Sequence, residues 1–386
     1  MFNVYTLNKI SSIGTDIFDK SKYAVSEDCA NPDAIMVRSA KMHDMTFGDK
    51  LLCIARAGAV VNNIPVERCA QEGICVFNTP GANANAVKEL AICALLLASR
   101  KITEAAAWAA SLKGTEDAPK TVESGKSKFA GPEIAGKTLG VIGLGAIGGK
   151  IANAAEALGM KVIGYDPYLS VGAALQMNPA IKIVPELNDI YKNSDYITIH
   201  MPYTPQTKNT IDAEQIAMMK DGVRLINLAR GELINSAAVV EAIKAGKVAK
   251  YVTDFADDIV LGEEGVIVLP HLGASTPESE DNCAVMAADE IIDYLENGNI
   301  RNSVNYPNLS MNAVGTKICI IHKNVPTTIA SITTVVGNEG INIENMANAS
   351  KGDFAYTMLD VTGEIPASVE GKINAVDGVI RVRVIG

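Results

Sequence analysis

The chain has 386 residues, of which 48% are hydrophobic and 20% charged, and its formal net charge is −10. This length exceeds one ordinary domain, and the balance of residue types is typical of globular proteins. The sequence has neither a bilayer-spanning apolar stretch nor a signal-peptide pattern at its start, which predicts a cytoplasmic protein without a membrane partner. The acidic charge and the lack of a basic stripe argue against nucleic acid as a partner.

Seven cysteines occur without CxxC spacing. An odd number in apolar runs favours reduced core thiols over disulfides or a thiolate metal site, so no metal is expected.

In the first ninety residues, short apolar runs alternate with polar turns. AIMVRS, LLCIARAGA and ICVFNTP predict strands, and PVERCAQEG predicts a helix that ends at glycine. A helical pattern follows from Asn83 to about Gly114, apolar all round at its centre, which is typical of a buried helix. Residues 115–136 then form a polar linker.

From Lys137, apolar strands alternate regularly with helices, which predicts a doubly wound parallel sheet. The segment TPESEDNCAVMAADEIIDYLENGN predicts a long helix capped by Thr276, with Pro277 in its first turn. The last seventy residues predict a ferredoxin-like βαββαβ module. We therefore predict an α/β chain with two Rossmann-like domains and a C-terminal module. Their ranges are 1–95 with 283–312, then 96–282, then 316–386.

A glycine-rich loop follows the strand that begins this regular region. GLGAIG places Gly143, Gly145 and Gly148 in GxGxxG spacing, and Asp166 ends the next strand. In this strand–loop–helix context the pattern indicates a pyrophosphate held at a helix N-terminus. An aspartate at this position binds ribose hydroxyls and repels a 2′-phosphate, which favours NAD over NADP. A glycine-rich turn without a ligand is the alternative.

Three polar residues end strands of the same predicted sheet: Arg230, Asp254 and His271. Ligands of doubly wound folds bind outside the carboxyl ends of the strands, so we expect the three to converge on one crevice. Strand-end residues that merely meet water are the alternative. An arginine fork binds a carboxylate, and an imidazole that titrates near neutrality accepts a proton.

Several blocks resemble the D-isomer-specific 2-hydroxyacid dehydrogenase family, namely NTPGANANAVKELA, GKTLGVIGLGAIG, HMPYTPQT, NLARGELI and PHLGAST. The resemblance implies a substrate-binding domain (1–95 with 283–312), an NAD-binding domain (96–282) and catalysis by Arg230 and His271. It implies that further residues contact the cofactor: Ala146, Ile147, Met201, Pro202, Leu228, Ala229, Asp254, Gly273 and Ala274. His200 is expected to shape the loop beside this crevice.

In this family a glutamate partners the histidine, but Ile259 occupies its position in DFADDIVLGEEG. Asp258 is our candidate substitute, and Asp257 and Glu263 are alternatives. We expect weaker or more pH-dependent proton transfer.

The resemblance also implies substrate contacts from Arg38, Arg56 and the backbone at Gly58, where the family's loop GTGVDN reads GAVVNN. Two extra cations suit a phosphorylated 2-hydroxy acid. A surface salt bridge is the alternative for each arginine. Lys126 and Lys128 are expected to be solvated, as is His43.

The C-terminal module resembles the ACT domain. His322, Asn324 and Asn342 match positions that contact L-serine in regulated members, but Thr327 replaces a glycine at the helix start. A side chain there would crowd a ligand lying against the backbone. Two roles of the module stay open: binding of L-serine, or pairing of subunits alone. The expected assembly is a homodimer or homotetramer. Two other functions stay open: reduction of glyoxylate or hydroxypyruvate, and NAD(H) sensing without catalysis.

Overall fold

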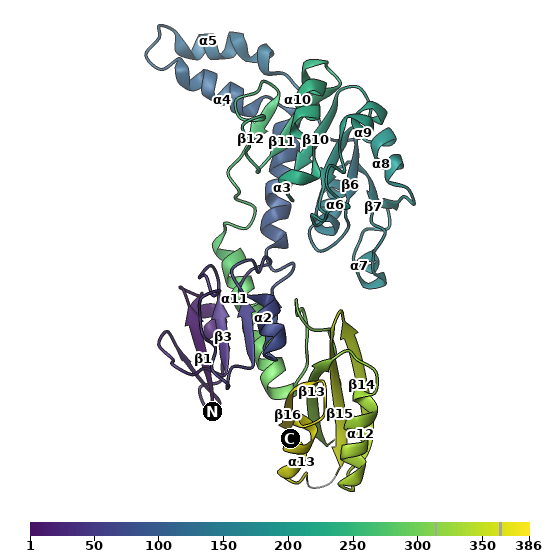
Figure 1. The fold of residues 1–386 in the computed structure, drawn as a ribbon. Helices are drawn as coiled ribbons and strands as arrows, with labels where there is room; N and C mark the ends of the chain where they lie inside the picture. Colours follow the sequence, from purple (N-terminus) through teal and green to yellow (C-terminus); the bar gives the residue numbers. More distant parts are fainter. Residues whose placement is uncertain (313–314, 363–364) are drawn as a thin grey trace. The chain divides into compact units, whose positions relative to one another are not determined.

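The computed structural model describes residues 1–312, 315–362 and 365–386 (Figure 1). The chain divides into two compact units, one formed by Met1–Ala82 with Glu280–Gly386 and the other by Asn83–Ser279. The first boundary lies at 82/83, where the sequence suggested 95/96, because helix α3 (Ala84–Ser99) packs against α6, β10 and β11 of the second unit. The C-terminal module belongs to the first compact unit.

The first unit begins with a parallel five-stranded sheet in the order β2-β1-β3-β4-β5. Its strands are β1 (Phe2–Leu7), β2 (Tyr23–Ser26), β3 (Ala34–Val37), β4 (Cys53–Arg56) and β5 (Cys75–Asn78). Its helices are α1 (Ser12–Thr15), α2 (Val66–Gln71) and the long α11 (Pro277–Asn297). The Thr276 hydroxyl accepts a hydrogen bond from the Ser279 N–H at 3.1 Å, which confirms the predicted cap of α11.

The second unit holds a parallel seven-stranded sheet in the order β12-β11-β10-β9-β6-β7-β8. Its strands are β6 (Thr138–Ile142), β7 (Lys161–Tyr165), β8 (Lys182–Ile183), β9 (Tyr196–Ile199), β10 (Val223–Asn227), β11 (Val248–Thr253) and β12 (Val266–Val268). Its other elements are α6 (Gly148–Ala157), α7 (Val171–Leu175), α8 (Leu187–Asn193), α9 (Ala213–Met218), η2 (Gly231–Leu233) and α10 (Ser236–Lys244).

Alternate residues of these strands enter two separate cores. Val141 packs with α3 and α6, whereas its neighbour Ile142 packs with α8, α9 and α10. Both faces of the sheet are therefore covered by helices, which explains why its strands read as apolar runs with little alternation. The doubly wound parallel sheet is confirmed.

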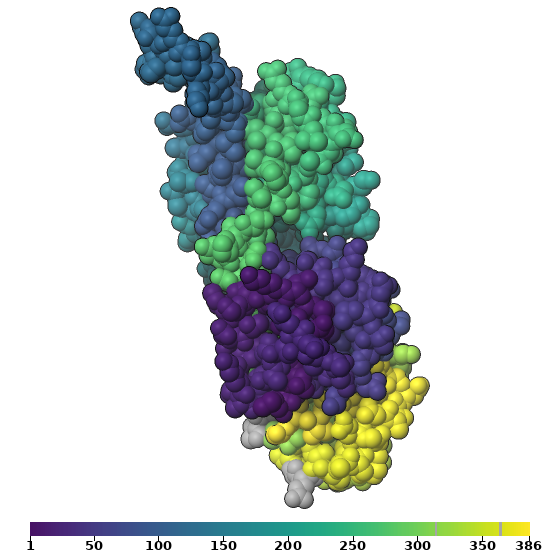
Figure 2. Space-filling model, turned by 90° about the vertical axis from the view of Figure 1, so that its left-hand side faces the viewer, coloured from purple at the N-terminus to yellow at the C-terminus, as the bar shows by residue number. Residues whose placement is uncertain are grey.

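The prediction of one long helix from Asn83 to Gly114 is wrong in one respect, because the helix is interrupted at Arg100. The Ser99 hydroxyl donates to the Leu95 carbonyl and lies 2.8 Å from the Tyr196 hydroxyl, and Arg100 is extended. A serine that bonds back to its own helix favours such an end. The helix resumes as α4 (Ile102–Ser111), and the expected linker contains α5 (Ala118–Gly125) and η1 (Lys126–Phe129). This segment, blue in Figure 2, projects from its unit, and Glu104 near its start pairs with Lys250 of β11 at 2.6 Å.

The last seventy residues form the expected βαββαβ order: β13 (Thr316–Lys323), α12 (Thr328–Asn338), β14 (Asn342–Lys351), β15 (Phe354–Thr362), α13 (Ser368–Asn374) and β16 (Val379–Ile385). The strands make an antiparallel sheet in the order β14-β15-β13-β16. We call this segment the C-terminal module.

The C-terminal module is attached to the end of α11 through main-chain carbonyls. Arg383 donates to the carbonyls of Tyr294 and Leu295, and Lys317 donates to that of Asn297. The Tyr356 hydroxyl donates to the next carbonyl, Gly298. These carbonyls lie at or just beyond the last turn of α11, where intrahelical donors run out, although Tyr294 also accepts the Gly298 N–H at 3.0 Å. The module therefore supplies most of the donors that the helix end lacks.

All seven cysteines are free, and five of them are buried, whereas Cys93 is exposed. The expectation of core thiols therefore holds for most of them. No helix within the described residues is both long and apolar enough to cross a bilayer.

Candidate active site

The candidate site lies at the carboxyl edge of the seven-stranded sheet, where successive strands end in residues singled out from the sequence. Gly143 follows β6, Asp166 follows β7, Arg230 comes shortly after β10, and Asp254 follows β11. Strand β12 ends at Val268, so His271 lies three residues beyond it, not at its last position. This edge of a parallel sheet is where doubly wound folds bind ligands.

The glycine loop has room for a phosphate group only because its glycines lack side chains. Gly143 has φ +90°, and a Cβ there would lie 2.5 Å from the His200 carbonyl oxygen. A Cβ on Gly148 would lie 1.9 Å from the Gly143 carbonyl oxygen, so only glycine lets α6 start here. A Cβ on Gly145 would meet nothing within 4 Å. The loop therefore presents open backbone in front of a helix N-terminus, which suits a pyrophosphate.

Asp166 fixes this loop from the neighbouring strand. One carboxylate oxygen accepts the Leu144 N–H at 2.9 Å, and the other accepts the Tyr168 N–H at 2.9 Å. Each oxygen keeps a second lone pair for a ribose hydroxyl.

A buried carboxylate and an exposed imidazole form the centre of the site. Asp254 Oδ2 lies 3.0 Å from His271 Nδ1, and the side chains are 0% and 57% exposed. Neither carboxylate oxygen has a well-formed hydrogen bond to a described residue, so the ion-pair contact is what compensates its burial. The Phe255 ring packs against the imidazole with centroids 4.9 Å apart. The histidine is thus held on two sides.

Burial raises the pKa of Asp254, and the charges of His271 and Arg230 oppose that shift. The structure joins Asp254 and His271 by direct contact, and Arg230, shortly after the neighbouring strand β10, contributes its charge to the same carboxylate.

Asn227 positions Arg230, and sequence reasoning missed it. Asn227 is fully buried, donates to the Arg230 carbonyl at 2.8 Å and accepts the Ala229 N–H at 3.2 Å. One guanidinium N–H of Arg230 donates to the Ala229 carbonyl at 2.6 Å, and a bidentate carboxylate would need two of the others. The available signal was an amide side chain at the end of β10.

The expected carboxylate substitutes lie elsewhere. Asp257 accepts the N–H groups of Ile259 and Val260 and a hydroxyl from Ser236, so it caps its own loop. Asp258 is exposed, and no ion pair joins it to His271 in the described part of the chain. Its role as a partner stays a prediction. Asp254 takes that place because the parallel pairing of Thr253 with Val268 brings the two strand ends together.

The remaining expected cofactor contacts surround this edge. Met201 and Pro202 follow β9, Leu228 and Ala229 follow β10, and Gly273 lies near Asp254. Ala274 follows it in the chain. Burial lowers the pKa of His200 to about 3, and its Nε2 lies 2.7 Å from the Thr198 hydroxyl. A neutral imidazole bonded to its own strand fits the structural role expected for it.

Arg38 and Arg56 end neighbouring strands, β3 and β4, in the first unit. Arg56 Nε donates to the Arg38 carbonyl at 3.0 Å, and Arg38 forms an ion pair with Glu280 at 2.6 Å. Gly58 lies against Arg56, since a Cβ there would meet its guanidinium at 2.8 Å. The structure therefore groups all three expected substrate contacts.

The two linker lysines are engaged locally. Lys126 pairs with Glu123, and Lys128 lies 5.7 Å from the centre of the Trp108 ring.

In the C-terminal module, His322 is 2% exposed and both ring nitrogens are occupied. Nδ1 lies 2.8 Å from the Lys323 carbonyl and Nε2 lies 2.9 Å from the Thr357 hydroxyl. Asn324 and Asn342 are exposed and bonded to Gly352 and Glu344. Thr327 has φ +72°, a strained conformation for a β-branched residue that glycine adopts freely.

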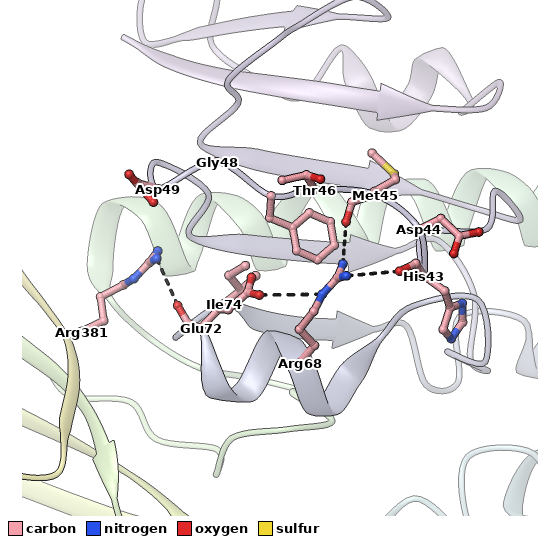
Figure 3. Close-up of a pocket in the computed structure, with 11 residues that line it drawn as sticks. His43, Asp44, Met45, Thr46, Gly48, Asp49, Arg68, Glu72, Ile74 and Arg381 are labelled. Carbon is pink, nitrogen blue, oxygen red and sulfur yellow. Dashed lines mark hydrogen bonds and ion pairs between the residues drawn. The ribbon is translucent and has the colours of Figure 1, made fainter.

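Figure 3 shows a cavity of about 480 Å³ between residues 43–49, α2 and Arg381. Arg68 donates to the carbonyls of His43 and Met45 and lies over the Phe47 ring. Arg381 donates to the carbonyls of Leu51 and Glu72. Both arginines that line the cavity therefore donate to main-chain carbonyls of the protein itself. His43 is exposed at its margin, as expected.

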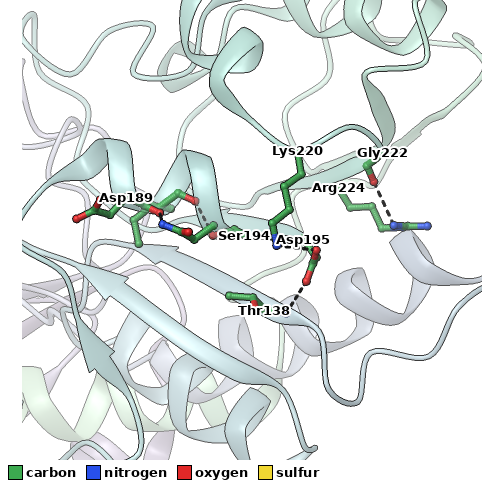
Figure 4. Close-up of polar contacts among 9 residues, drawn as sticks. Thr138, Asp189, Ser194, Asp195, Lys220, Gly222 and Arg224 are labelled. Atoms are coloured by element: carbon green, nitrogen blue, oxygen red, sulfur yellow. Dashed lines mark hydrogen bonds and ion pairs between the residues drawn. The ribbon is translucent and has the colours of Figure 1, made fainter.

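The opposite, amino edge of the seven-stranded sheet holds a different carboxylate (Figure 4). Asp195 accepts the Thr138 N–H at 2.8 Å and the Lys220 ammonium at 3.0 Å. Burial would raise the pKa of Asp195, but these two contacts outweigh it and lower the pKa. The group ties three strand starts together, since Arg224 N–H also donates to the Asp195 carbonyl.

Residues 92–273 match the family model for the NAD-binding domain of D-isomer specific 2-hydroxyacid dehydrogenases. D-3-phosphoglycerate dehydrogenase of Synechocystis sp. is 33% identical over 99% of this chain and 71% of that protein. The enzyme of the same name from Methanocaldococcus jannaschii is 38% identical over 76% of this chain and 56% of its own length. This chain therefore spans little more than half of that relative.

Among solved structures, NAD+-bound 3-phosphoglycerate dehydrogenase of Entamoeba histolytica superposes with a TM-score of 0.60 at 26% identity. The match covers 80% of this chain and 99% of that one. D-mandelate dehydrogenase of Rhodotorula graminis superposes with a TM-score of 0.66 at 22% identity, covering 80% and 98%. The match to the NAD-binding domain confirms the cofactor predicted from the glycine loop.

Proposed function

Because the chain belongs to the D-isomer specific 2-hydroxyacid dehydrogenases, we propose that it oxidises 3-phosphoglycerate to 3-phosphohydroxypyruvate with NAD, which begins L-serine biosynthesis. The observation that carries this proposal is the His271–Asp254 pair beside Arg230, because it supplies a base, its partner and a carboxylate anchor. The relatives named D-3-phosphoglycerate dehydrogenase support the choice of substrate.

The reaction needs a proton acceptor for the substrate hydroxyl, and bound NAD supplies the hydride acceptor. Nδ1 of His271 faces the Asp254 carboxylate, so in the neutral ring Nδ1 carries the proton and donates it in that contact. Nε2 is then the free acceptor that takes the hydroxyl proton. The resulting imidazolium is stabilised by Asp254, and a well-placed base of this kind contributes roughly 10²–10⁴-fold.

Arg230 binds the substrate carboxylate in this proposal. Its backbone is held on both sides by Asn227, so the guanidinium starts from a fixed turn. A planar fork matches a carboxylate bidentately, and lysine would offer only a point charge.

The phosphate group is assigned to Arg38 and Arg56. Two arginines from neighbouring strand ends suit a dianion better than an uncharged hydroxymethyl group. This assignment separates the proposal from reduction of glyoxylate or hydroxypyruvate.

The test is an NAD-linked assay of the purified chain with 3-phosphoglycerate and D-glycerate, and in reverse with hydroxypyruvate phosphate, hydroxypyruvate and glyoxylate. We expect kcat/KM to be highest for the phosphorylated compounds. A preference for the unphosphorylated acids would identify the reductase instead. Tight NADH binding without turnover of any of them would identify a sensor.

The proposal includes a regulatory ACT role for the C-terminal module, assembly as a homodimer or homotetramer, and a cytoplasmic location that suits seven free cysteines. Because both nitrogens of His322 are occupied, pairing of subunits is favoured over serine binding. Calorimetric titration with L-serine tests this, using the wild type and Thr327→Gly. Heat in the Thr327→Gly variant alone would show that the threonine blocks a serine site.

A further inference from the structure

One acidic side chain faces the arginine pair of the first unit. The pairing of Val37 with Arg56 in the sheet brings the ends of β3 and β4 together, and Arg56 bonds to the Arg38 carbonyl. Burial lowers the pKa of Arg56, and the neighbouring Arg38 charge contributes. Two arginines at neighbouring strand ends make this part of the sheet edge favourable for an anion.

Glu280 supplies that anion in this structure. Its carboxylate lies 2.6 Å from a terminal nitrogen of Arg38, and both side chains are 44% exposed. Within residues 1–312, 315–362 and 365–386, it is the one acid in an ion pair with either arginine. Cys283 faces the same arginines one turn later, but burial raises the pKa of its thiol and keeps it neutral.

We propose that Glu280 is a specificity-determining residue: it occupies Arg38 until a phosphate-bearing substrate displaces it. This inference rests on the proposed function for the identity of the substrate, but the competition itself concerns any phosphate group. A ligand without an anionic group at this position leaves the carboxylate on Arg38, so the competition sets the affinity for phosphorylated ligands and leaves unphosphorylated analogues unaffected.

The contact is suited to exchange. An exposed ion pair is worth only about 0.2–1 kcal/mol. A phosphate dianion offers more acceptor oxygens and a larger charge to both guanidinium groups, so it wins the competition. Glu280 also lies in the first turn of the 21-residue helix α11, where the helix dipole stabilises a carboxylate. The displaced side chain therefore retains a favourable position.

The experiment compares Glu280→Gln with a matched control, Glu278→Gln. Glu278 lies in the first turn of the same helix, is exposed, and has no ion pair in the described structure. Each variant removes one negative charge, so the control corrects for the overall field. The measurements on the full chain are calorimetric binding of inorganic phosphate and steady-state kinetics with 3-phosphoglycerate and D-glycerate.

We expect Glu280→Gln to bind phosphate about two- to fivefold more tightly than Glu278→Gln, the factor that corresponds to losing an exposed pair. KM for 3-phosphoglycerate should fall by the same factor, with kcat and the D-glycerate parameters unchanged. Equal behaviour of the two variants would reduce the effect to net charge and overturn the inference. Weaker binding in Glu280→Gln would show that Glu280 positions Arg38, and would also overturn it.

A double-mutant cycle with Arg38→Met completes the test. Without Arg38, Glu280→Gln should give no gain in phosphate affinity, whereas a persisting gain would contradict direct competition. If phosphate binds to none of the variants, there is no anion site and the inference fails. If the binding results hold while 3-phosphoglycerate is not oxidised, the proposed function fails and the competition stands.

Discussion

Asp254 and Asp195 lie at opposite edges of one seven-stranded sheet, and their surroundings shift their pKa values in opposite directions. Asp195 receives a backbone N–H and a lysine, and its pKa is lowered. The Asp254 side chain is fully buried, His271 is its one ion-pair partner among the described residues, and burial raises its pKa. The amino edge uses a carboxylate to hold the sheet together, whereas the carboxyl edge keeps one with few hydrogen bonds beside an imidazole. The comparison teaches that stability and chemistry are separated along the strands.

The largest effect should come from removing the base. His271→Asn should lower kcat/KM by roughly 10²–10⁴-fold, because it removes the exposed imidazole that Asp254 orients. Binding of NADH, followed by fluorescence, should be retained. Activity within a few-fold of wild type would mean that the carboxyl edge is not the site of proton transfer.

The next effect separates the two aspartates. Asp254→Asn should lower kcat by roughly 100-fold, since the imidazolium loses its counter-charge. The free energy of unfolding at pH 7 should not fall, because a buried charge with a raised pKa is removed. Urea melts and kinetics on the same preparation provide the measurement. A large loss of stability with normal kcat would reverse the comparison.

Glu290 in α11 provides a third carboxylate, which is buried like Asp254 but belongs to the first compact unit. Burial raises its pKa to about 8, and Asn302 donates to it at 2.7 Å. The folded protein favours the protonated form of Glu290, whereas the unfolded chain ionises it from about pH 4.5. The free energy of unfolding therefore falls as pH rises from about 4.5 to about 8. Glu290→Gln should therefore raise the free energy of unfolding at pH 9 by about 2 kcal/mol, with little change at pH 4.

Urea melts at the two pH values test this for Glu290, with kcat as the control. A gain that does not depend on pH would assign the effect to packing.

The smallest effect belongs to Asp195. Asp195→Asn should lower the free energy of unfolding at pH 7 by about 1 kcal/mol, because the Lys220 contact is partly exposed. Its lowered pKa means that this stability is present above pH 4 and is lost as pH falls through the folded pKa. The wild type and variant should therefore converge in melts near pH 2. A change in kcat would contradict the purely structural role.

Much of the fold was predictable because apolar runs of the right length report burial directly. The parallel sheet, the βαββαβ order and the Thr276 cap followed from local patterns. The break at Arg100 did not, since it depends on a contact between Ser99 and Tyr196, which are 97 residues apart. Local helical patterning carries no information on such a partner.

The residues of the candidate site could likewise be predicted from the sequence, but one of their contacts could not. Glycines, an arginine and a histidine at strand ends are visible as types and positions. The pairing of His271 with Asp254 was not, because we looked for the carboxylate in the loop after Asp254, where a family glutamate is missing. The contact depends on the register of β11 and β12, which sequence patterns do not specify.

The attachment of the C-terminal module has an evolutionary consequence. Arg383, Lys317 and Tyr356 bond to backbone carbonyls at the end of α11, and every residue type provides a carbonyl. Side chains on the receiving segment can therefore drift without costing these particular hydrogen bonds. These hydrogen bonds therefore constrain only the three donors, whereas the receiving segment is constrained by packing, since the centre of the Tyr294 ring lies 4.6 Å from the Arg383 guanidinium. Substitutions of the donors should cost hydrogen bonds, and substitutions of Tyr294 should cost buried contact instead.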